Sequence, residues 1–301
     1  LGMTSGGGLG TAYGGIGYAC GKQGAIWKTT DSGITWQKLN QTATQCDLYS
    51  ISFLQGQWGV AVGFSNGPAI IYTTDGGNTW ASAKVPAGVA TIRDVIYRET
   101  PGAFCFAVGA DSSGHGVILY SDYGGEYWII DKTTPMPMYS ITMDDEYLDG
   151  RNPMIAVGDA GQVFVTTAWK PDSNGAIYYG LIWNDHSSGN ENLRSISYFT
   201  NTYDVFEGVA LTDNGSTLWT TDGGVTWAEH SQNVSSYVPN SAVYAASGSE
   251  AWISGSHIGR TTDNGVTWKN EDPVSGQTWT CITGAGRIGF LSGAGLYWLI
   301  R

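Results

Sequence analysis

The sequence predicts an all-β fold, a single seven-bladed β-propeller of four-stranded antiparallel blades with a tight turn between the third and fourth strands. Three observations lead to this prediction. Only 13% of the residues are charged, whereas Gly (44) and Trp (13) are frequent, which is typical of short strands joined by turns. One eight-residue motif recurs along the chain. The strands around it recur with a period of roughly 40–50 residues, the length of a propeller blade.

The recurring motif is TTDSGITW at 29–36, which returns as TTDGGNTW at 73–80, TTDGGVTW at 220–227 and TTDNGVTW at 261–268. A further copy, SDYGGEYW at 121–128, is predicted to carry one extra residue. The aspartates of the five copies are Asp31, Asp75, Asp122, Asp222 and Asp263. They are separated by 44, 47, 100 and 41 residues, so the long step contains two repeats. The sequence predicts a divergent copy there, with Ala168 in place of the aspartate and Trp183 closing the motif.

Three strands are predicted before each motif and one after it. In the second repeat they are LYSISF at 48–53, GVAVG at 59–63 and AIIYTTD at 69–75, and the fourth strand follows Trp80. Runs of Val, Ile and Tyr bounded by Gly are typical of such strands. The predicted blades occupy residues 1–44, 45–88, 89–134, 135–188, 189–236, 237–275 and 276–301.

The last blade is predicted to lack its outer strand. Its GLYWLIR segment at 295–301 aligns with GAIWKTT at 24–30, the third strand of the first repeat. A bare sheet edge can accept a strand from another chain, which suggests a module that docks into a larger assembly. The alternatives are that Leu1–Thr4 closes this blade or that the chain is trimmed.

The motif is predicted to be structural. Its Asp can accept hydrogen bonds from backbone amides two and three residues further on, and its Gly can adopt a positive φ. These roles recur in each copy, whereas a catalytic group would be needed only once. The Trp residues of the motif are predicted to bury a large surface between blades, and they are Trp36, Trp80, Trp128, Trp183, Trp227 and Trp268.

The motif resembles the Asp box, (S/T)-x-D-x-G-x-T-W, of the propeller family with BNR repeats. That family includes sialidases, xyloglucan-type glycoside hydrolases, sortilin-like receptors and photosystem II assembly factors. The form GVAVG…IIYTTDGGNTW is most similar to the assembly-factor repeat. The resemblance implies that the Asp boxes lie away from the functional site. It also implies an arginine-rich face, of which Arg93 and Arg194 would be the members here.

The charge of the chain argues against two classes of partner. Lys and Arg total 14 against 26 Asp and Glu, for a net charge of −12, so nucleic acid and anionic membrane surfaces are not expected to bind. No apolar run is long enough for membrane insertion. The composition suits an extracellular or lumenal protein, and a first residue Leu suits a processed or trimmed chain. Three sequons could carry glycans, although chance predicts almost as many, and they lie at Asn40, Asn214 and Asn233.

The four cysteines leave two interpretations open. Cys20, Cys46, Cys105 and Cys281 form no C-x-x-C pair, so zinc and thioredoxin patterns are excluded. They can form two disulfides or be four small buried side chains. No cofactor or metal is predicted, because the motif lacks the ligand spacing of a calcium loop. The acidic run MDDEYLD at 143–149 is the better calcium candidate, with a solvated loop as the alternative.

A binding site is predicted at the rim opposite the turns. In each first strand, the residue two positions before a buried Ile or Val should lie at the mouth of the central channel. This column consists of Tyr49, Arg93, Tyr139, Arg194, Ser241 and Thr280. Tyr and Arg are frequent anchors of binding sites. The alternative is that the tyrosines pack and the arginines pair with neighbours such as Asp94.

An enzyme is the less favoured interpretation. A sialidase needs three arginines, a Tyr nucleophile with a Glu partner and an acidic Asp, but no FRIP-like segment lies near the N-terminus. A glycoside hydrolase needs two facing carboxylates. His115 and His257 have no evident nucleophile nearby in sequence. The candidate carboxylates, among which no spacing singles out a pair, are Asp47, Asp94, Asp159 and Glu191.

The sequence therefore favours a non-catalytic module for protein interaction or structural assembly, whose partner is another protein or a second copy of the chain. The alternative is carbohydrate binding or glycoside hydrolysis at the face formed by Tyr49, Arg93, Tyr139 and Arg194.

Overall fold

The computed structural model describes residues 2–3, 15–40, 43–98, 104–122, 124–143, 153–169, 181–200, 206–230, 242–247, 249–284, 287–292 and 295–300. These residues form strands and two short 3-10 turns, η1 (Lys22–Gly24) and η2 (Asp159–Gly161). Within these ranges, no helix is long and apolar enough to cross a membrane.

The first three sheets follow one another along the chain. The first contains β1 (Gly2–Met3), β2 (Gly17–Cys20), β3 (Ile26–Thr29) and β4 (Gln37–Lys38). The second contains β5 (Asp47–Leu54), β6 (Trp58–Phe64), β7 (Pro68–Thr73) and β8 (Ala81–Ser82). The third contains β9 (Val89–Arg98), β10 (Phe104–Asp111), β11 (Gly116–Ser121) and β12 (Ile129–Thr134).

The remaining sheets continue this order. The fourth contains β13 (Met138–Met143), β14 (Met154–Gly158), β15 (Val163–Trp169) and β16 (Leu181–Asp185). The fifth contains β17 (Leu193–Thr200), β18 (Phe206–Thr212), β19 (Thr217–Thr220) and β20 (Ala228–His230). The sixth contains β21 (Ala242–Ser247), β22 (Glu250–Ser254), β23 (Ile258–Thr261) and β24 (Lys269–Asn270). The last contains β25 (Trp279–Gly284), β26 (Arg287–Ser292) and β27 (Gly295–Ile300).

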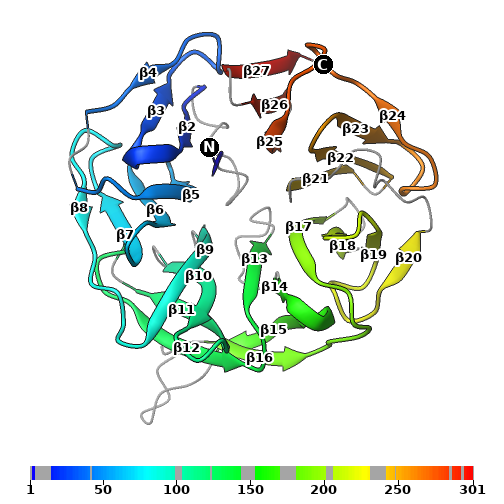
Figure 1. The fold of residues 1–301 in the computed structure, drawn as a ribbon, viewed down its shortest axis with the longest axis horizontal. Helices are drawn as coiled ribbons and strands as arrows, with labels where there is room; N and C mark the ends of the chain where they lie inside the picture. The colour runs from blue at the N-terminus through cyan, green and yellow to red at the C-terminus, as the bar shows by residue number, and fades with distance from the viewer. Residues whose placement is uncertain are drawn as a thin grey trace.

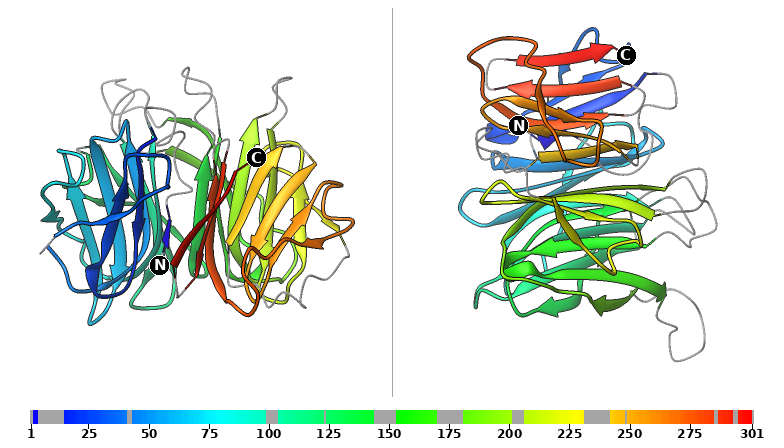
Figure 2. Two further views of the ribbon diagram at one scale, coloured as in Figure 1. Left: turned by 90° about the horizontal axis from the view of Figure 1, so that it is seen from above. Right: turned by 90° about the vertical axis from the view of Figure 1, so that its right-hand side faces the viewer.

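The sheets stand around a central axis, as in a β-propeller (Figure 1). All strand pairs within the sheets are antiparallel, and the first strand of each sheet is the innermost. The inner strand β25 contacts β1, which brings the last sheet against the first and closes the ring. Figure 2 shows the strands running between two rims of the ring.

The prediction of seven four-stranded blades is wrong in its count. The described residues form six four-stranded blades, and β25–β27 form a sheet of three strands between the sixth blade and the first. The alternative in which Leu1–Thr4 closes the last blade is also wrong for the residues that are described. Gly2 and Met3 pair with Cys20 and Ala19, so they form the inner strand of the first blade and do not complete the last.

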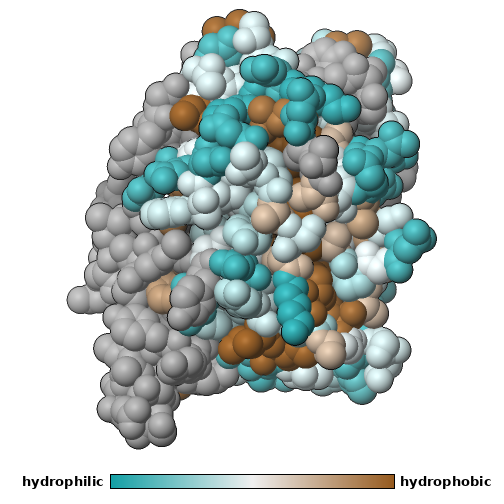
Figure 3. All heavy atoms as spheres, turned by 90° about the vertical axis from the view of Figure 1, so that its left-hand side faces the viewer, coloured by the Kyte–Doolittle hydropathy of each residue, from teal (hydrophilic) through white to brown (hydrophobic). Residues whose placement is uncertain are grey.

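The core lies between neighbouring blades. One cluster joins the third and fourth blades through Phe106, Ile118, Met138, Phe164 and Trp183, all buried. Central strands such as β14, MIAVG, are buried along their whole length, because each sheet is covered on both faces by its neighbours. On the side of the ring shown in Figure 3, the described surface is mixed, with hydrophilic residues interrupted by hydrophobic patches.

The Asp, Thr and Gly residues of the turn motif make the same hydrogen bonds in its four complete copies. In the first, Asp31 Oδ1 accepts the Thr29 hydroxyl at 2.8 Å and the Thr35 amide at 2.9 Å, while Oδ2 accepts the Thr35 hydroxyl at 2.6 Å. The Gly33 amide donates to Thr29 Oγ1 at 2.9 Å, and Gly33 has a φ of +87°. The positive φ confirms the role predicted for the Gly. The amide bound by Asp31 belongs to the fourth residue on, so the predicted spacing of two and three residues is corrected.

These bonds favour the ionised carboxylate. The hydroxyl and the amide of Thr35 lower the pKa of Asp31 to about 2, and Thr267 does the same for Asp263. Each bond joins residues within one turn, so the motif folds locally at each blade.

The copy at 121–128 corrects the role predicted for Asp122. The Gly125 amide donates to Ser121 Oγ at 3.2 Å, and Trp128 Nε1 donates to the Gly125 carbonyl at 2.7 Å. The same two bonds join Gly33 to Thr29 and Trp36 to Gly33 in the first copy. The copy therefore has the normal length rather than an extra residue, and Asp122 stands one position before the place of the aspartate.

We expect Asp222→Ala to lower the free energy of unfolding by about 1–2 kcal/mol, because two amide or hydroxyl donors of Thr226 and the Thr220 hydroxyl would lose their acceptor. Asp122→Ala is the matched control and should change stability by less than about 0.5 kcal/mol. Urea unfolding followed by Trp fluorescence measures both. Equal losses in the two variants would contradict the assignment of Asp122.

The other structural predictions have mixed outcomes. Cys46 and Cys105 are thiols outside any disulfide, so two disulfides do not form, and burial raises the pKa of Cys105. Cys20 is buried in β2, and the side chain of Cys281 lies outside the described part of the chain. Asn40 and Asn214 are exposed, while Asn233 and most of the acidic run 143–149 lie outside the described residues. No metal-binding cluster occurs among the side chains that are described.

Candidate binding site at the mouth of the ring

The predicted site residues lie at the rim opposite the turn motif. In the second blade, β5 begins at Asp47, which pairs with Phe64 at the end of β6, and Phe64 pairs with Pro68 at the start of β7. The motif begins at the other end of β7, where Thr73 pairs with Gly59. We call the rim at which the inner strands begin the mouth rim.

Each described member of the predicted column is the bulge residue of its inner strand. Leu48 pairs with Gly63 and Ser50 with Val62, so Tyr49 is left out of the ladder. The same skip occurs at Arg93, Tyr139, Arg194 and Thr280 in four other inner strands. A bulge turns its extra residue away from the regular alternation of the strand and often re-aims a side chain near a functional site. Ser241 lies outside the described residues.

A Gly in the second strand makes room for the bulges at Tyr49, Arg93 and Tyr139, whereas Thr212 and Ser292 stand at this position beside Arg194 and Thr280. A Cβ on Gly109 would lie 1.9 Å from the carbonyl oxygen of Thr91, two residues before Arg93. At Gly63 the corresponding distance is 2.0 Å to Asp47, two residues before Tyr49. The Gly that ends GVAVG and CFAVG is therefore required by the close approach of the bulged inner strand.

The bulges bring the four predicted side chains into one stack. The guanidinium of Arg93 lies 5.6 Å from the ring centre of Tyr49 and 5.7 Å from that of Tyr139. The guanidinium of Arg194 lies on the same ring, 4.1 Å from the centre of Tyr139. The order of the stack, Tyr49–Arg93–Tyr139–Arg194, follows the blades around the mouth, and cations within about 6 Å of an aromatic ring centre are attracted to it.

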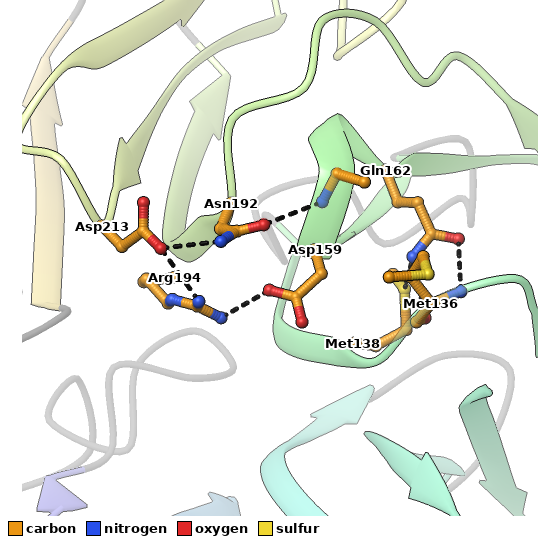
Figure 4. A network of polar contacts seen from close by, with 8 residues as sticks. Met136, Met138, Asp159, Gln162, Asn192, Arg194 and Asp213 are labelled. Atoms are coloured by element: carbon orange, nitrogen blue, oxygen red, sulfur yellow. Dashed lines mark hydrogen bonds and ion pairs between the residues drawn. The ribbon is translucent and has the colours of Figure 1, made fainter. Parts of the chain in front are cut away.

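The two arginines differ in their electrostatic surroundings. Arg194 donates to Asp159 at 2.7 Å and to Asp213 at 3.1 Å, and Asn192 donates to Asp213 at 2.8 Å (Figure 4). The bond from Asn192, opposed by burial and assisted by Arg194, holds the pKa of Asp213 below its usual value. Arg93 is exposed, and it has no ion pair with any carboxylate among the described residues. Of the two arginines in the stack, Arg194 is therefore neutralised, and Arg93 has no carboxylate partner among the described residues.

The network around Arg194 continues into the fourth blade. Asn192 Oδ1 accepts the backbone amide of Ala160 in η2, where Ala160 has a φ of +55°. Gln162 then bonds to the backbone of Met136 through both ends of its side-chain amide (Figure 4). Asn192 thus connects the fifth blade to the fourth at the mouth rim.

Asp94 does not pair with an arginine, and it is not placed as a free catalytic acid. Its Oδ1 accepts the Ser50 hydroxyl at 2.7 Å and the Val95 amide at 2.9 Å. Its Oδ2 accepts the Ser140 hydroxyl at 2.9 Å and the Ile141 amide at 3.0 Å. Burial of the carboxylate raises the pKa of Asp94, while these four bonds oppose the rise. The alternative in which the arginines pair with neighbouring carboxylates therefore holds for Arg194, through Asp159 and Asp213, but neither arginine pairs with Asp94 in the described contacts.

The remaining candidate carboxylates also bind protein groups. Asp47 Oδ1 accepts the amide of Gln23 at 2.9 Å. Asp159 pairs with Arg194, and Glu191 accepts the side-chain amide of Asn214. The structure thus brings Asp159 to the stack, while Asp47 and Glu191 bridge neighbouring parts of the mouth rim.

The two candidate histidines lie in connections between second and third strands. His257 Nδ1 lies 2.6 Å from Asp272 Oδ2, and Asn270 Nδ2 lies 3.0 Å from the same ring nitrogen. His115 is exposed, with Nδ1 at 3.5 Å from Asp111 Oδ2. These pairs belong to the sixth and third blades and are not part of the stack.

Sequence reasoning missed Asn192 and Asp213, which hold Arg194 in place. Both lie just outside strands, and nothing in their spacing marks them. The Gly opposite the bulges of the second, third and fourth blades was a visible signal in the sequence, but the reason for it requires the pairing of the inner strand.

No family model and no curated protein matches the chain. Solved structures do match it. YCF48 from Cyanidioschyzon merolae has a TM-score of 0.66 and 17% identity over 95% of this chain and 92% of its own. A structure of YCF48 bound to D1 peptide gives the same score and identity over 95% of this chain and 90% of its own.

Two other similar structures are of an enzyme and of a propeller domain. The GH74 enzyme of Niastella koreensis has a TM-score of 0.69 and 13% identity over 99% of this chain, which corresponds to 51% of the enzyme. The β-propeller domain of Cps50 (Swd1) from Myceliophteria thermophila has a TM-score of 0.65 and 11% identity over 96% of this chain and 94% of its own. At these identities the similarity shows the fold, a β-propeller, and nothing finer.

Proposed function

We propose that the protein is a protein-interaction module that binds a segment of a partner protein across the stack of Tyr49, Arg93, Tyr139 and Arg194. The observation that supports this proposal most directly is the environment of the Arg93 side chain. Its guanidinium is exposed between two tyrosine rings, without an ion pair among the described residues, in a chain of net charge −12. A carboxylate of the partner would form an ion pair with Arg93, and the two tyrosine rings would pack against adjacent side chains of the partner.

The comparison with YCF48 supports a peptide ligand, since that similar propeller has been solved with the D1 peptide. The Asp-box resemblance and an extracellular or lumenal location are part of the same proposal. So is the view that β25–β27 form a seventh blade without its outer strand. The recurring turn bonds support the Asp-box resemblance, and the three-stranded sheet supports a last blade without its outer strand.

The test is to pan a phage-displayed library of random linear peptides against the protein and to measure selected peptides against variants. Arg93→Ala is expected to weaken their binding by about 10–100-fold, because it removes a central charged anchor. Lys22→Ala is the matched control, since Lys22 is an exposed cation in η1 at the mouth rim outside the stack. Peptides that bind both variants equally, or a library without enrichment, would refute the proposal.

Carbohydrate binding or glycoside hydrolysis at the same face is the second candidate, and the similarity to a GH74 enzyme favours testing it. Each of the four candidate carboxylates already binds a protein donor, which gives hydrolysis less support than peptide binding. A panel of chromogenic glycosides would separate the two, because turnover that is lost in Asp159→Asn would establish an enzyme.

A further inference from the structure

We propose that Asp94 is a positioning residue that sets the spacing of the stack at the mouth by tying three blades together through one carboxylate. The inference concerns the arrangement of Tyr49, Arg93 and Tyr139 in the unbound protein, so it holds whatever the mouth binds.

The bonds of Asp94 reach the chain neighbours of three stack residues. Ser50, which donates to Oδ1, follows Tyr49, and Ser140, which donates to Oδ2, follows Tyr139. Asp94 itself follows Arg93. The carboxylate of Asp94 thus links Ser50, the neighbour of Tyr49, to Ser140, the neighbour of Tyr139, and Asp94 is itself the neighbour of Arg93. Ser50 and Ser140 are 9% and 7% exposed, so their hydroxyls are held in an ordered part of the rim.

The bulges explain why a bond between blades is needed to set the spacing of the stack. Tyr49, Arg93 and Tyr139 are each left out of their ladders, so strand pairing within a blade does not fix their distance from one another. The residue after each bulge is the first that returns to regular pairing. A bond between blades at that residue therefore fixes how far apart the two rings stand from the guanidinium.

The other blades show what the position does without a carboxylate. Ser50 Oγ accepts the Val95 amide at 3.4 Å, and Ser140 Oγ accepts the Ile196 amide at 3.4 Å. As acceptors, these serines reach only the following blade, through a bond of 3.4 Å, and their short bonds of 2.7 and 2.9 Å are the ones they donate to Asp94. Asp94 reaches the blades on both sides through bonds of 2.7–3.0 Å, and it is the only acidic residue at this position in the described inner strands.

The experiment compares Asp94→Asn and Asp94→Ser with the parent protein by NMR of the arginine Nε–Hε groups. The chain has seven arginines, and the signal of Arg93 is assigned by its absence in Arg93→Lys. Arg93 should be displaced upfield in the parent by the rings of Tyr49 and Tyr139. We expect that displacement to be lost in Asp94→Asn, because Val95 and Ile141 donate to different oxygens and the amide keeps an oxygen at only one of the two positions. The displacement should be partly retained in Asp94→Ser, which matches the neighbouring blades.

Arg260 supplies the internal control, since it lies 5.2 Å from the ring of Trp252 in the sixth blade. Its signal should not move. Amide exchange of Val95 and Ile141 should become faster by about tenfold in Asp94→Asn. An Arg93 signal that stays in place while those amides lose protection would refute a positioning role. Equal movement of Arg93 and Arg260 would also refute it, because it would show general loosening.

If Asp94→Asn does not fold, Ser50→Ala and Ser140→Ala remove one donor each and leave the carboxylate. Each is expected to shift the Arg93 signal part of the way, whereas no shift in both would refute the proposal. These signals are read without a ligand, so a failed peptide selection would leave this result standing, and a refuted role of Asp94 would leave peptide binding testable.

Discussion

Replacing Gly109 with Ala is expected to lower the free energy of unfolding by about 3 kcal/mol, because a Cβ there would lie 1.9 Å from the carbonyl oxygen of Thr91. The obstacle is backbone and cannot rotate away. The inner strand must move outward or lose its bulge, and either change displaces Arg93. Urea unfolding measures the stability, and the Arg93 side-chain signal reports the displacement.

Gly67→Ala is the matched control. A Cβ on Gly67 meets no atom within 4 Å, and its φ is not positive, so the substitution should be neutral or stabilising by up to about 1 kcal/mol. If Gly109→Ala were as stable as Gly67→Ala, the close approach of the bulged strand would not be what requires a Gly there.

Trp183→Ala is expected to cost about 3–5 kcal/mol, which is the range for removing a buried Trp. Trp183 is 7% exposed and belongs to the cluster that joins the third and fourth blades. Its Nε1 also donates to Asp131 Oδ2 of the third blade at 2.8 Å. In the described part of the fourth blade, β15 continues as a strand through Ala168, the position of the aspartate in the other copies, and this Trp is a main contact of the outer strand β16.

Trp183→Phe separates the two contributions. It keeps most of the apolar contact and loses the bond to Asp131, so it should cost about 1–2 kcal/mol. Unfolding in urea, followed by circular dichroism so that the lost Trp does not bias the signal, measures both variants. A loss below about 1 kcal/mol for Trp183→Ala would contradict a structural role between the blades.

The function proposed for the mouth depends on a difference in ion pairing between two arginines that occupy the same position of the sequence repeat. Arg93 and Arg194 occupy equivalent bulges, yet two carboxylates neutralise Arg194 while Arg93 has none among the described residues. The difference arises because Asp159, which follows β14 of the fourth blade, and Asp213, which follows β18 of the fifth, both lie against Arg194. A ligand with a carboxylate should therefore bind nearer to the third blade than to the fifth.

The turn motif could be predicted from sequence nearly in full, because its bonds join residues at most four apart. The column of site residues was also predictable, since it follows the repeat. Asp122 was misplaced because the sequence shows an aspartate but not which position of the turn it occupies. The count of seven blades followed from the period, with the last blade predicted to lack its outer strand, and the described residues form six four-stranded blades and the three-stranded sheet β25–β27.

By itself, the sequence determined the all-β class, the repeat and the local turns, since these depend on neighbours along the chain. Only the tertiary structure decided which of the predicted residues meet. Ser50 and Ser140 lie 44 and 46 residues from Asp94, yet both bind it. Those bonds form because the closed ring places the inner strands of successive blades side by side. Residues within one repeat carry no information about this proximity between blades.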